Sequence, residues 1–307
     1  MSSKLYSLKT DVERNYIMLI STQTGHSVAR LGFEEGVLTL KNAGYDALDL
    51  SLFEMIRDDS PYIAGDWRAL VKERKAFCDA NGIVFNQTHA PFSFAWADEN
   101  VRENIAKPRV EQSLEISAMM GAKMAIVHPL HWMPYLGHEK EAFDLNVEYY
   151  KSLVPLARNL GVKIALENMW QRELKRKCIC TDVAGFAKDH ADLIDAIDSE
   201  WVVACLDVGH CSLVGEEAEN TIRILGHDRL KAVHLHDNDY QGDRHTIPFL
   251  GQMNWDNIMK AFEDINYDGE FTYEADAFLK GFPTDYLPKA IEFMVQTARY
   301  LVAKTSL

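Results

Sequence analysis

Short apolar runs alternate with amphipathic stretches along the whole chain, and this alternation constrains the fold more than any other feature. The apolar runs predict β-strands, and the stretches with a 3.6-residue period predict helices. Eight strand and helix pairs can be counted. The predicted strands are 16–22, 47–53, 83–90, 123–129, 163–168, 202–207, 231–236 and 271–274. The predicted helices are 33–44, 66–80, 98–120, 141–160, 181–197, 216–225, 255–265 and 285–303.

Strands that are apolar throughout are typical of parallel strands buried on both faces. Eight consecutive βα units therefore predict an α/β fold, the closed (β/α)8 TIM barrel, in which functional residues lie at the carboxyl ends of the strands. The competing architecture is an open doubly wound sheet, which requires a glycine-rich phosphate-binding turn after its first strand. The segment STQTGHS lacks that turn. Because the 307 residues contain no Pro-rich, Ser/Gly-rich or low-complexity spacer, we interpret 1–307 as one TIM barrel domain.

The composition predicts a soluble, cytoplasmic protein with no membrane partner. Hydrophobic residues make up 47% of the chain, yet no apolar stretch approaches the roughly 18 to 20 residues that a membrane span requires. The first fifteen residues carry charge throughout and lack the apolar centre of a signal peptide. Five cysteines, an odd number, favour reduced thiols over a disulfide framework.

The charge balance argues against nucleic acid as a partner. Lysine and arginine number 32 against 46 aspartate and glutamate, which gives a net charge of −14, and such a field repels polyanions. One predicted loop opposes this trend with Arg172, Lys175, Arg176 and Lys177. It is interpreted either as a solvated charged loop or as an anchor for a phosphate or carboxylate group.

Four predicted strands in the second half of the chain end in residues that bind metals. The strands KIALEN, VVACLD, KAVHLH and FTYE bring Glu167, Asp207, His234 and Glu274. Each residue alone could cap a loop or satisfy a backbone carbonyl, but four successive strand ends with the same chemistry favour a shared site. Mixed carboxylate and imidazole ligands suit divalent cations. The sequence therefore predicts a metal site at one rim of the barrel.

Other polar and aromatic residues are candidates for enlarging this site. His210 follows Asp207 by three residues, and His236 faces the same side of its strand as His234 because side chains repeat every two residues. His89 and His128 end the third and fourth strands, and Asp243 and His245 follow the seventh. A histidine that only donates to a backbone carbonyl is the alternative in each case. The aromatic residues predicted to form an apolar pocket wall are Trp96, Trp132, Trp170 and Phe249.

The order of these motifs resembles the xylose isomerase-like barrel superfamily, which groups sugar and sugar phosphate isomerases and epimerases with endonuclease IV. The motifs that carry the resemblance are THAP, VHP, ENM, LDVGH, VHLHD, DRH and YEA. The resemblance implies a divalent ion, Mn most of all, with Mg, Co or Zn as alternatives. Its ligands would be Glu167, Asp207, His234 and Glu274, and the two glutamates would also move protons as the catalytic pair.

Substrate-binding residues and further metal ligands are expected beside these four. The substrate-binding set comprises His210, His236, Glu173, Trp132, His89 and His128. Glu173 occupies the place of a substrate-binding glutamate of ketose 3-epimerases, whereas Tyr240 stands where those enzymes have an arginine. All metal positions of endonuclease IV are matched as well, so His210, Asp243 and His245 form a candidate second metal site.

The chemistry expected of such a site is proton abstraction next to a carbonyl through a metal-stabilised enediolate. The predicted function is a metal-dependent isomerase or epimerase of a small-molecule sugar or sugar phosphate. Three alternatives stay open: a metal-dependent lyase or dehydratase acting on a keto-sugar, inositol or glycoside, an endonuclease IV-like AP endonuclease, and a non-catalytic sugar sensor. The exposed helices of such barrels commonly pair, so a homo-oligomer is also expected.

Overall fold

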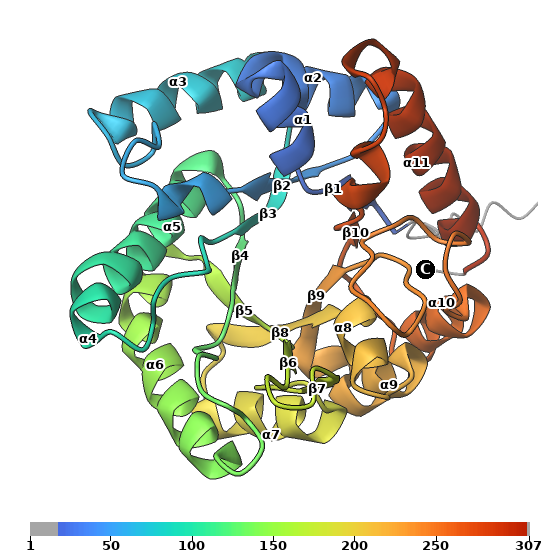
Figure 1. The fold of residues 1–307 in the computed structure, drawn as a ribbon. Helices are drawn as coiled ribbons and strands as arrows, with labels where there is room; N and C mark the ends of the chain where they lie inside the picture. Colours follow the sequence, from blue (N-terminus) through green and yellow to red (C-terminus); the bar gives the residue numbers. More distant parts are fainter. Residues whose placement is uncertain (1–17, 306–307) are drawn as a thin grey trace, which may run out of the picture.

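The chain forms a ring of parallel strands surrounded by helices, as a computed structural model that describes residues 18–305 shows (Figure 1). The barrel strands are β1 (Ile20–Thr22), β2 (Leu48–Ser51), β3 (Phe85–His89), β4 (Met124–Val127), β5 (Lys163–Glu167), β8 (Val202–Asp207), β9 (Leu230–His234) and β10 (Phe271–Tyr273). The long outer helices are α2 (Phe33–Ala43), α3 (Trp67–Ala80), α5 (Lys107–Met120), α6 (Glu139–Leu160), α7 (Ala187–Ile197), α9 (Ala218–Arg229), α10 (Trp255–Asp264) and α11 (Leu287–Val302).

Shorter elements occupy the loops. They are α1 (Gly25–Leu31), η1 (Phe53–Ile56), α4 (Glu99–Val101), η2 (Arg102–Ala106), β6 (Trp170–Arg172), β7 (Ile179–Thr181), α8 (Val208–Leu213), η3 (Asp276–Leu279) and η4 (Thr284–Tyr286). No helix within residues 18–305 combines the length and the apolar character that crossing a membrane requires. Of the predicted first strand, Tyr16 and Ile17 lie outside the described residues, as does the amino-terminal segment used to predict a cytoplasmic location.

The strands close into a barrel in sequence order. Six strands form one parallel sheet in the order β2, β3, β4, β5, β8 and β9, and β1 pairs in parallel with β10. Two parallel bridges join the two groups: Gln23 pairs with Asp49, and Leu235 pairs with Tyr273. The prediction of a (β/α)8 barrel is therefore confirmed.

Two hydrophobic layers hold the barrel together. The barrel interior contains a small apolar cluster formed by Ile126, Ala165, Val203, Cys205 and Ala232. The strand residues between them face outward and join a much larger cluster under the helices. On β8, for example, Val203 and Cys205 face inward while Ala204 and Leu206 face the helices. This alternation follows from the two-residue period of a strand.

The third predicted helix is interrupted in the structure. Residues 98–120 were expected to form one helix, but a π-helical turn, η2, separates α4 from α5. Pro108 lies at the start of α5, and proline has no N–H to donate to a carbonyl four residues earlier, while its ring clashes with that carbonyl. The wider π-helical turn accommodates this break in the hydrogen-bond ladder.

The predicted start of the fifth helix was wrong. Thr181 was expected to open it, but Ile179–Thr181 is strand β7, which pairs with β6 in an antiparallel hairpin. Helix α7 begins at Ala187. The backbone of 179–181 is thus already paired and cannot enter a helix.

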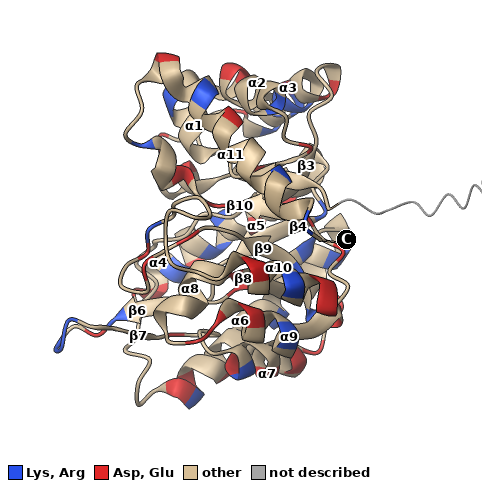
Figure 2. Ribbon diagram, turned by 90° about the vertical axis from the view of Figure 1, so that its right-hand side faces the viewer, with Lys and Arg blue, Asp and Glu red and all other residues tan. Residues whose placement is uncertain are grey.

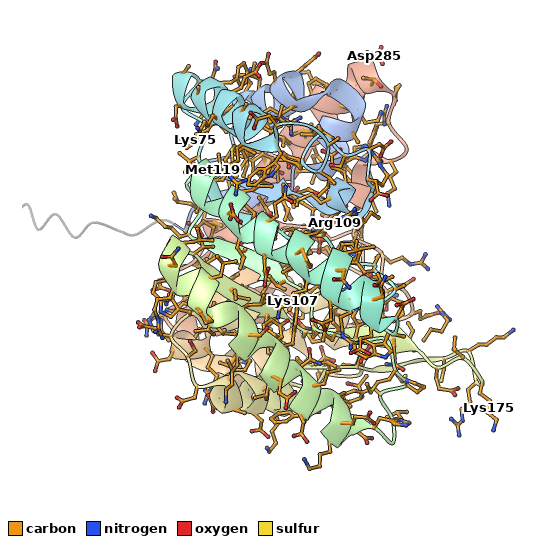
Figure 3. The ribbon with its side chains drawn as sticks, turned by 90° about the vertical axis from the view of Figure 1, so that its left-hand side faces the viewer. Lys75, Lys107, Arg109, Met119, Lys175 and Asp285 are labelled. Carbon is orange, nitrogen blue, oxygen red and sulfur yellow. The ribbon has the colours of Figure 1, made fainter. Side chains whose placement is uncertain are left out.

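Of the basic residues predicted to lie in a loop, Lys175, Arg176 and Lys177 lie in the turn of this hairpin, whereas Arg172 is the last residue of strand β6. The hairpin projects from the barrel and carries blue residues at its end (Figure 2), and Lys175 lies near the extremity (Figure 3). Leu174 at the same tip is 85% exposed. The cluster therefore lies apart from the barrel axis.

A buried histidine in α7 makes stability depend on pH. His190 is fully buried, and its Nε2 lies 3.0 Å from the carbonyl oxygen of Leu166. Burial lowers the pKa of His190 to about 4. In the unfolded chain the imidazole of His190 binds a proton near pH 6.5, but in the folded chain it does so only near pH 4. The folded state therefore loses stability as the pH falls from about 6.5 to about 4. From pH 7 to pH 5 the loss attributable to this residue is about 2 kcal/mol.

We expect His190→Gln to reduce the loss in the free energy of unfolding between pH 7 and pH 5 by about 2 kcal/mol. Glutamine keeps an N–H donor for Leu166 but has no proton to gain. Urea unfolding of both proteins at the two pH values measures the difference. Equal pH dependence in the two proteins would contradict the assignment.

Candidate functional site

The two-residue period of the strands places the polar site residues inside the barrel, one layer above the interior apolar cluster. A residue two positions after an inward-facing one also faces inward. This relation links Ile126 to His128, Ala165 to Glu167, Cys205 to Asp207, and Ala232 to His234. The four polar residues therefore form the next layer of the interior, at the carboxyl ends of the strands.

The four residues predicted to bind a metal converge. One ligand atom from each of Glu167, Asp207, His234 and Glu274 lies within 4.8 Å of the others, and all four residues are buried. Nδ1 of His234 is 3.1 Å from Oε1 of Glu167 and 3.1 Å from Oε2 of Glu274. Asp207 and His234 are register partners on β8 and β9. Three carboxylates and one imidazole thus share a small buried volume.

The electrostatics of this group hold Glu167 and Glu274 in their ionised form. Burial raises the pKa of Glu167, but the neighbouring His234 and His128 outweigh burial and hold that pKa well below the usual range. The pKa of Glu274 is lowered in the same way, chiefly by His234, against the effect of burial. Oε2 of Glu167 has no well-aligned hydrogen-bond donor among the described residues and meets only the imidazoles of His128 and His89. Buried, ionised donors of this kind fit a divalent cation.

His89 and His128 approach the same glutamate from β3 and from the loop after β4. Nε2 of His128 lies 3.0 Å from Oε2 of Glu167, and Nε2 of His89 lies 3.3 Å from the same atom. Burial lowers the pKa of His128 to about 4. The imidazole of His128 is therefore neutral at pH 7, the form that can bind a metal or accept a hydrogen bond.

A second group of possible metal ligands lies beside the first. His210, Asp243 and His245 also bring their ligand atoms within 4.8 Å of one another. Oδ2 of Asp243 is 3.0 Å from Nε2 of His245 and 3.5 Å from Nε2 of His210. His236 connects the two groups, because its Nε2 is 3.0 Å from Oδ1 of Asp207 and its ring stacks on His245 with 4.1 Å between centroids.

A close approach of His236 explains the glycine of the DVGH motif. A Cβ atom at Gly209 would lie 2.0 Å from Cε1 of His236, which no packing adjustment of a buried ring allows. The same segment forms α8, whose first turn is capped by Asp207: Oδ1 accepts a hydrogen bond from the N–H of His210 at 2.8 Å. Helix α8 was absent from the sequence prediction.

Asp237 folds the loop that carries Asp243 and His245. Its carboxylate is fully buried and accepts hydrogen bonds from the N–H groups of Asn238, Phe249 and Met253 and from the indole N–H of Trp255, at 2.9 to 3.1 Å. These donors span the loop from Asn238 to the start of α10. The loop therefore depends on one buried carboxylate.

We expect Asp237→Asn to destabilise the fold by at least about 3 kcal/mol, because an amide NH2 then faces buried N–H donors that have lost their acceptor. Urea unfolding measures this effect. The matched control is Asp239→Asn in the same loop, where the side chain is 28% exposed and pairs with Arg244. Equal effects of the two substitutions would contradict the role of Asp237.

Several predicted residues lie outside the clustered groups. Glu173 is in the turn of the hairpin, where its carboxylate accepts a hydrogen bond from the N–H of Arg176. Trp132 packs under the guanidinium of Arg102, 5.5 Å from the ring centroid. Trp170 is closer to the site, with its ring centroid 6.5 Å from that of His210.

Two more of the four aromatic residues expected as a pocket wall also lie away from the clustered groups. Trp96 is 4% exposed and packs in the core near Tyr149. Phe249 is 54% exposed and contacts Tyr300. The rings that do border the site are Phe53, which meets His89 edge-on at 4.5 Å, and Phe92, which stacks on His128 at 4.3 Å. Both were missed because nothing local distinguishes them from core phenylalanines.

Three buried polar residues near the metal-type ligands were also missed. Asp49 approaches His234, Gln87 donates to Asp49 at 2.9 Å, and Gln23 donates to Oε1 of Glu274 at 2.8 Å. A signal existed for Asp49, because a charged residue inside the apolar run ALDLSLF is unusual for a buried strand.

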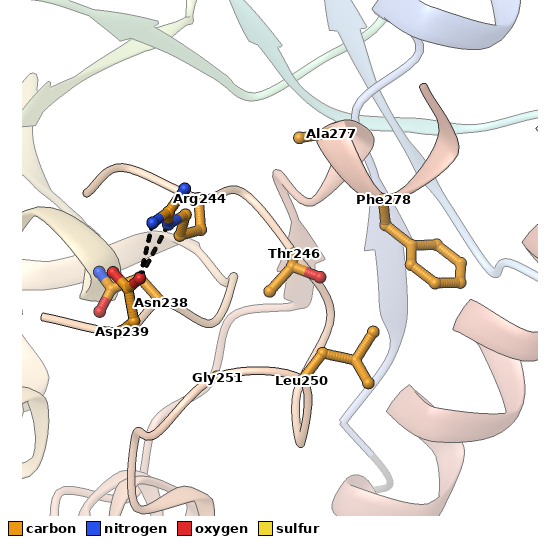
Figure 4. Close-up of a pocket in the computed structure, with 8 residues that line it drawn as sticks. All are labelled: Asn238, Asp239, Arg244, Thr246, Leu250, Gly251, Ala277 and Phe278. Atoms are coloured by element: carbon orange, nitrogen blue, oxygen red, sulfur yellow. Dashed lines mark hydrogen bonds and ion pairs between the residues drawn. The ribbon is translucent and has the colours of Figure 1, made fainter. Parts of the chain in front are cut away.

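A pocket on the same loop is separate from these groups. It lies between the β9–α10 loop and η3 (Figure 4), and Arg244 on its wall is held by two hydrogen bonds to Asp239, at 3.0 and 2.8 Å. None of its lining residues belongs to the clustered ligands. This pocket is therefore distinct from the site that the clustered ligands form in the barrel interior.

The sequence is similar to a known family over most of its length. The family described as xylose isomerase-like TIM barrel matches residues 37–297. Three uncharacterised relatives, from Methanocaldococcus jannaschii, Sinorhizobium fredii and again M. jannaschii, are 27%, 32% and 27% identical over 61%, 37% and 54% of this chain. The chain spans 62%, 33% and 61% of their lengths, less than two thirds in each case.

Two relatives carry names that state an activity. Fructoselysine 3-epimerase of Escherichia coli O157:H7 is 24% identical over 66% of this chain and 70% of its own length. Inosose dehydratase of Clostridium perfringens is 25% identical over 61% of this chain and 67% of its own length.

Solved structures share the fold. D-psicose 3-epimerase from Clostridium cellulolyticum H10, solved with D-tagatose, superimposes with a TM-score of 0.72 at 17% identity and covers 93% of this chain and 99% of its own. An IOLI protein with a bound zinc atom superimposes with a TM-score of 0.72 at 14% identity and covers 94% and 99%.

Proposed function

Because the chain belongs to the xylose isomerase-like TIM barrel family, we propose that it is a metal-dependent epimerase or isomerase of a small sugar or sugar phosphate. The observation that carries the proposal is the convergence of Glu167, Asp207, His234 and Glu274 within 4.8 Å in a buried layer. The names of the epimerase relatives support the substrate class.

We propose that these four residues hold one divalent ion, for which Mn is the first candidate, and Mg, Co and Zn are the others. Three carboxylates and an imidazole are ligands that all these ions accept. When bound, the ion would polarise the substrate carbonyl and lower the cost of forming an enediolate. The zinc in the neighbouring IOLI structure supports a metal at such a site in this fold.

The chain's own residues would move the proton and position the sugar. Glu167 and Glu274 are ionised at neutral pH, so either carboxylate can take a proton from the carbon next to the carbonyl while the other returns one to the opposite face. Gln23 holds Oε1 of Glu274 at 2.8 Å and leaves Oε2 directed to the cluster. Neutral His128, together with His89, His210 and His236, would bind substrate hydroxyl groups.

Deuterium wash-in tests this function. Incubation of the metal-loaded protein with a panel of ketoses in heavy water should place deuterium at the carbon next to the carbonyl without loss of any group from the sugar. Loss of water from an inosose instead would favour a dehydratase, the alternative that the C. perfringens relative supports. Binding of a sugar without exchange or elimination would favour a sensor.

The second ligand group supports a second candidate function. His210, Asp243 and His245, together with His89, His128 and Glu167, offer places for additional ions, and multinuclear sites suit phosphodiester hydrolysis. The net charge of −14 opposes binding to nucleic acid. Elemental analysis decides between them: one ion per chain and no cleavage of abasic DNA supports the epimerase, whereas three ions with cleavage supports the endonuclease.

A further inference from the structure

We propose that Asp49 on β2 is the positioning residue for His234: it accepts the Nε2–H of the imidazole and so presents Nδ1 as the metal-binding atom. The inference deepens the proposed function and rests on it for the identity of the ligand. Neither the motifs of the sequence nor the group of four ligands includes Asp49. The assignment comes from the contacts beneath the metal-binding layer.

The contacts place a buried carboxylate directly behind the imidazole. Asp49 is fully buried, and its Oδ2 lies 3.3 Å from Nε2 of His234. Gln87, the register partner of Asp49 on β3, donates from Nε2 to the same oxygen at 2.9 Å. Asp49 therefore has a fixed orientation, set by a neighbouring strand.

The proton on His234 follows from what each atom can do. Nδ1 of the ring lies among the other ligand atoms, whereas Nε2 lies toward Asp49 and Gln87, so an ion shared by the four ligands would meet Nδ1. A neutral imidazole that binds an ion through Nδ1 carries its one proton on Nε2. Oδ2 of Asp49, 3.3 Å away, is then the acceptor of that proton, while the amide nitrogen of Gln87, also 3.3 Å from Nε2, is a donor and offers no acceptor there.

The other ring nitrogen then has the right surroundings for a metal. Nδ1 of His234 faces Oε1 of Glu167 and Oε2 of Glu274, each at 3.1 Å. When an ion is bound, the lone pair on Nδ1 of His234 and those of the two carboxylates would point at one place, which the cation would fill. A carboxylate that orients a metal-bound histidine is a recurring arrangement, and its loss costs metal affinity.

The first experiment measures Mn²⁺ binding by calorimetry to the full chain and to Asp49→Asn. We expect the variant to bind about 10- to 100-fold more weakly, because the neutral amide no longer holds the Nε2–H through charge. The matched control is Asp46→Asn, the same substitution just before β2, where the carboxylate pairs with Arg299 and with the N–H of Ile20. Affinity equal to wild type in Asp49→Asn would overturn the inference and leave the proposed function standing.

A second measurement needs no variant of Asp49. In the wild-type protein labelled with ¹⁵N-histidine and loaded with diamagnetic Zn²⁺, long-range ¹H–¹⁵N spectra should show a proton on Nε2 and none on Nδ1 of His234, with the resonances identified by their loss in His234→Gln. A proton on Nδ1 with none on Nε2 would overturn the inference. A wild-type protein that binds neither Mn²⁺ nor Zn²⁺ would refute the metal-dependent function and the inference together, whereas metal binding through Nε2 would refute the inference alone.

Discussion

Replacing Glu167 or Glu274 by glutamine should lower turnover by about 10³-fold, within the range that a positioned acid or base contributes. Glutamine matches the size of glutamate but cannot take or return a proton. Each substitution also removes one charge from a ligand group whose atoms lie within 4.8 Å, so metal affinity should fall as well. Deuterium exchange measured at saturating Mn²⁺ separates the loss of proton transfer from the loss of metal.

A surface glutamate provides the control for this experiment. Glu115 pairs with Arg68 on the outer helices, so Glu115→Gln should leave exchange unchanged. Full exchange by either Glu167→Gln or Glu274→Gln at saturating Mn²⁺ would show that the glutamates are not the proton-moving pair. A residual exchange in one variant alone would assign the first proton abstraction to the other glutamate.

Removal of the metal should abolish activity and lower stability at the same time. Without a cation, the buried carboxylates of Glu167, Asp207 and Glu274 repel one another, and His234 is the imidazole that lies within 3.1 Å of both glutamates. A ligand present at 1,000 times its dissociation constant stabilises the folded state by about 4 kcal/mol. Chelation followed by thermal unfolding measures that loss, and added Mn²⁺ should restore both stability and deuterium exchange.

The variant His234→Gln tests whether this stabilisation comes from the proposed site. Its unfolding temperature should respond far less to Mn²⁺ than that of the wild type, because one of the four ligands is missing. An equal response in both proteins would place the bound metal elsewhere, for example at His210, Asp243 and His245. Unchanged activity of the chelated wild type would rule out the metal-dependent mechanism.

The prediction of the barrel from sequence succeeded because its causes are local. Apolar runs such as VVACLD fold as strands buried on both faces, and the amphipathic stretches between them cover the outside. The strand-end positions of Glu167, Asp207, His234 and Glu274 follow from the same pattern. Parallel strands in a closed barrel share one carboxyl-end rim, so residues about 30 to 40 positions apart were expected to meet.

The elements that the sequence did not reveal depend on contacts between distant segments or on single residues. Thr181 could open a helix or pair with Trp170, and only the folded hairpin shows that it pairs. Helix α8 is a short turn stabilised by the side chain of Asp207, which was interpreted as a ligand alone. Trp96 and Phe92 have the same apolar character, yet one packs in the core and the other stacks on His128.

The sequence by itself determined the barrel and the residue types at the carboxyl-end rim of its strands, because strand periodicity and strand order are properties of the chain. Only the tertiary structure decided which of those residues meet, and with which atoms. It separated Glu173 in the hairpin from the clustered ligands and brought Asp49 behind His234. The physical reason is that a contact between β2 and β9 depends on how the barrel closes, and nothing within either strand encodes the partner that it will face.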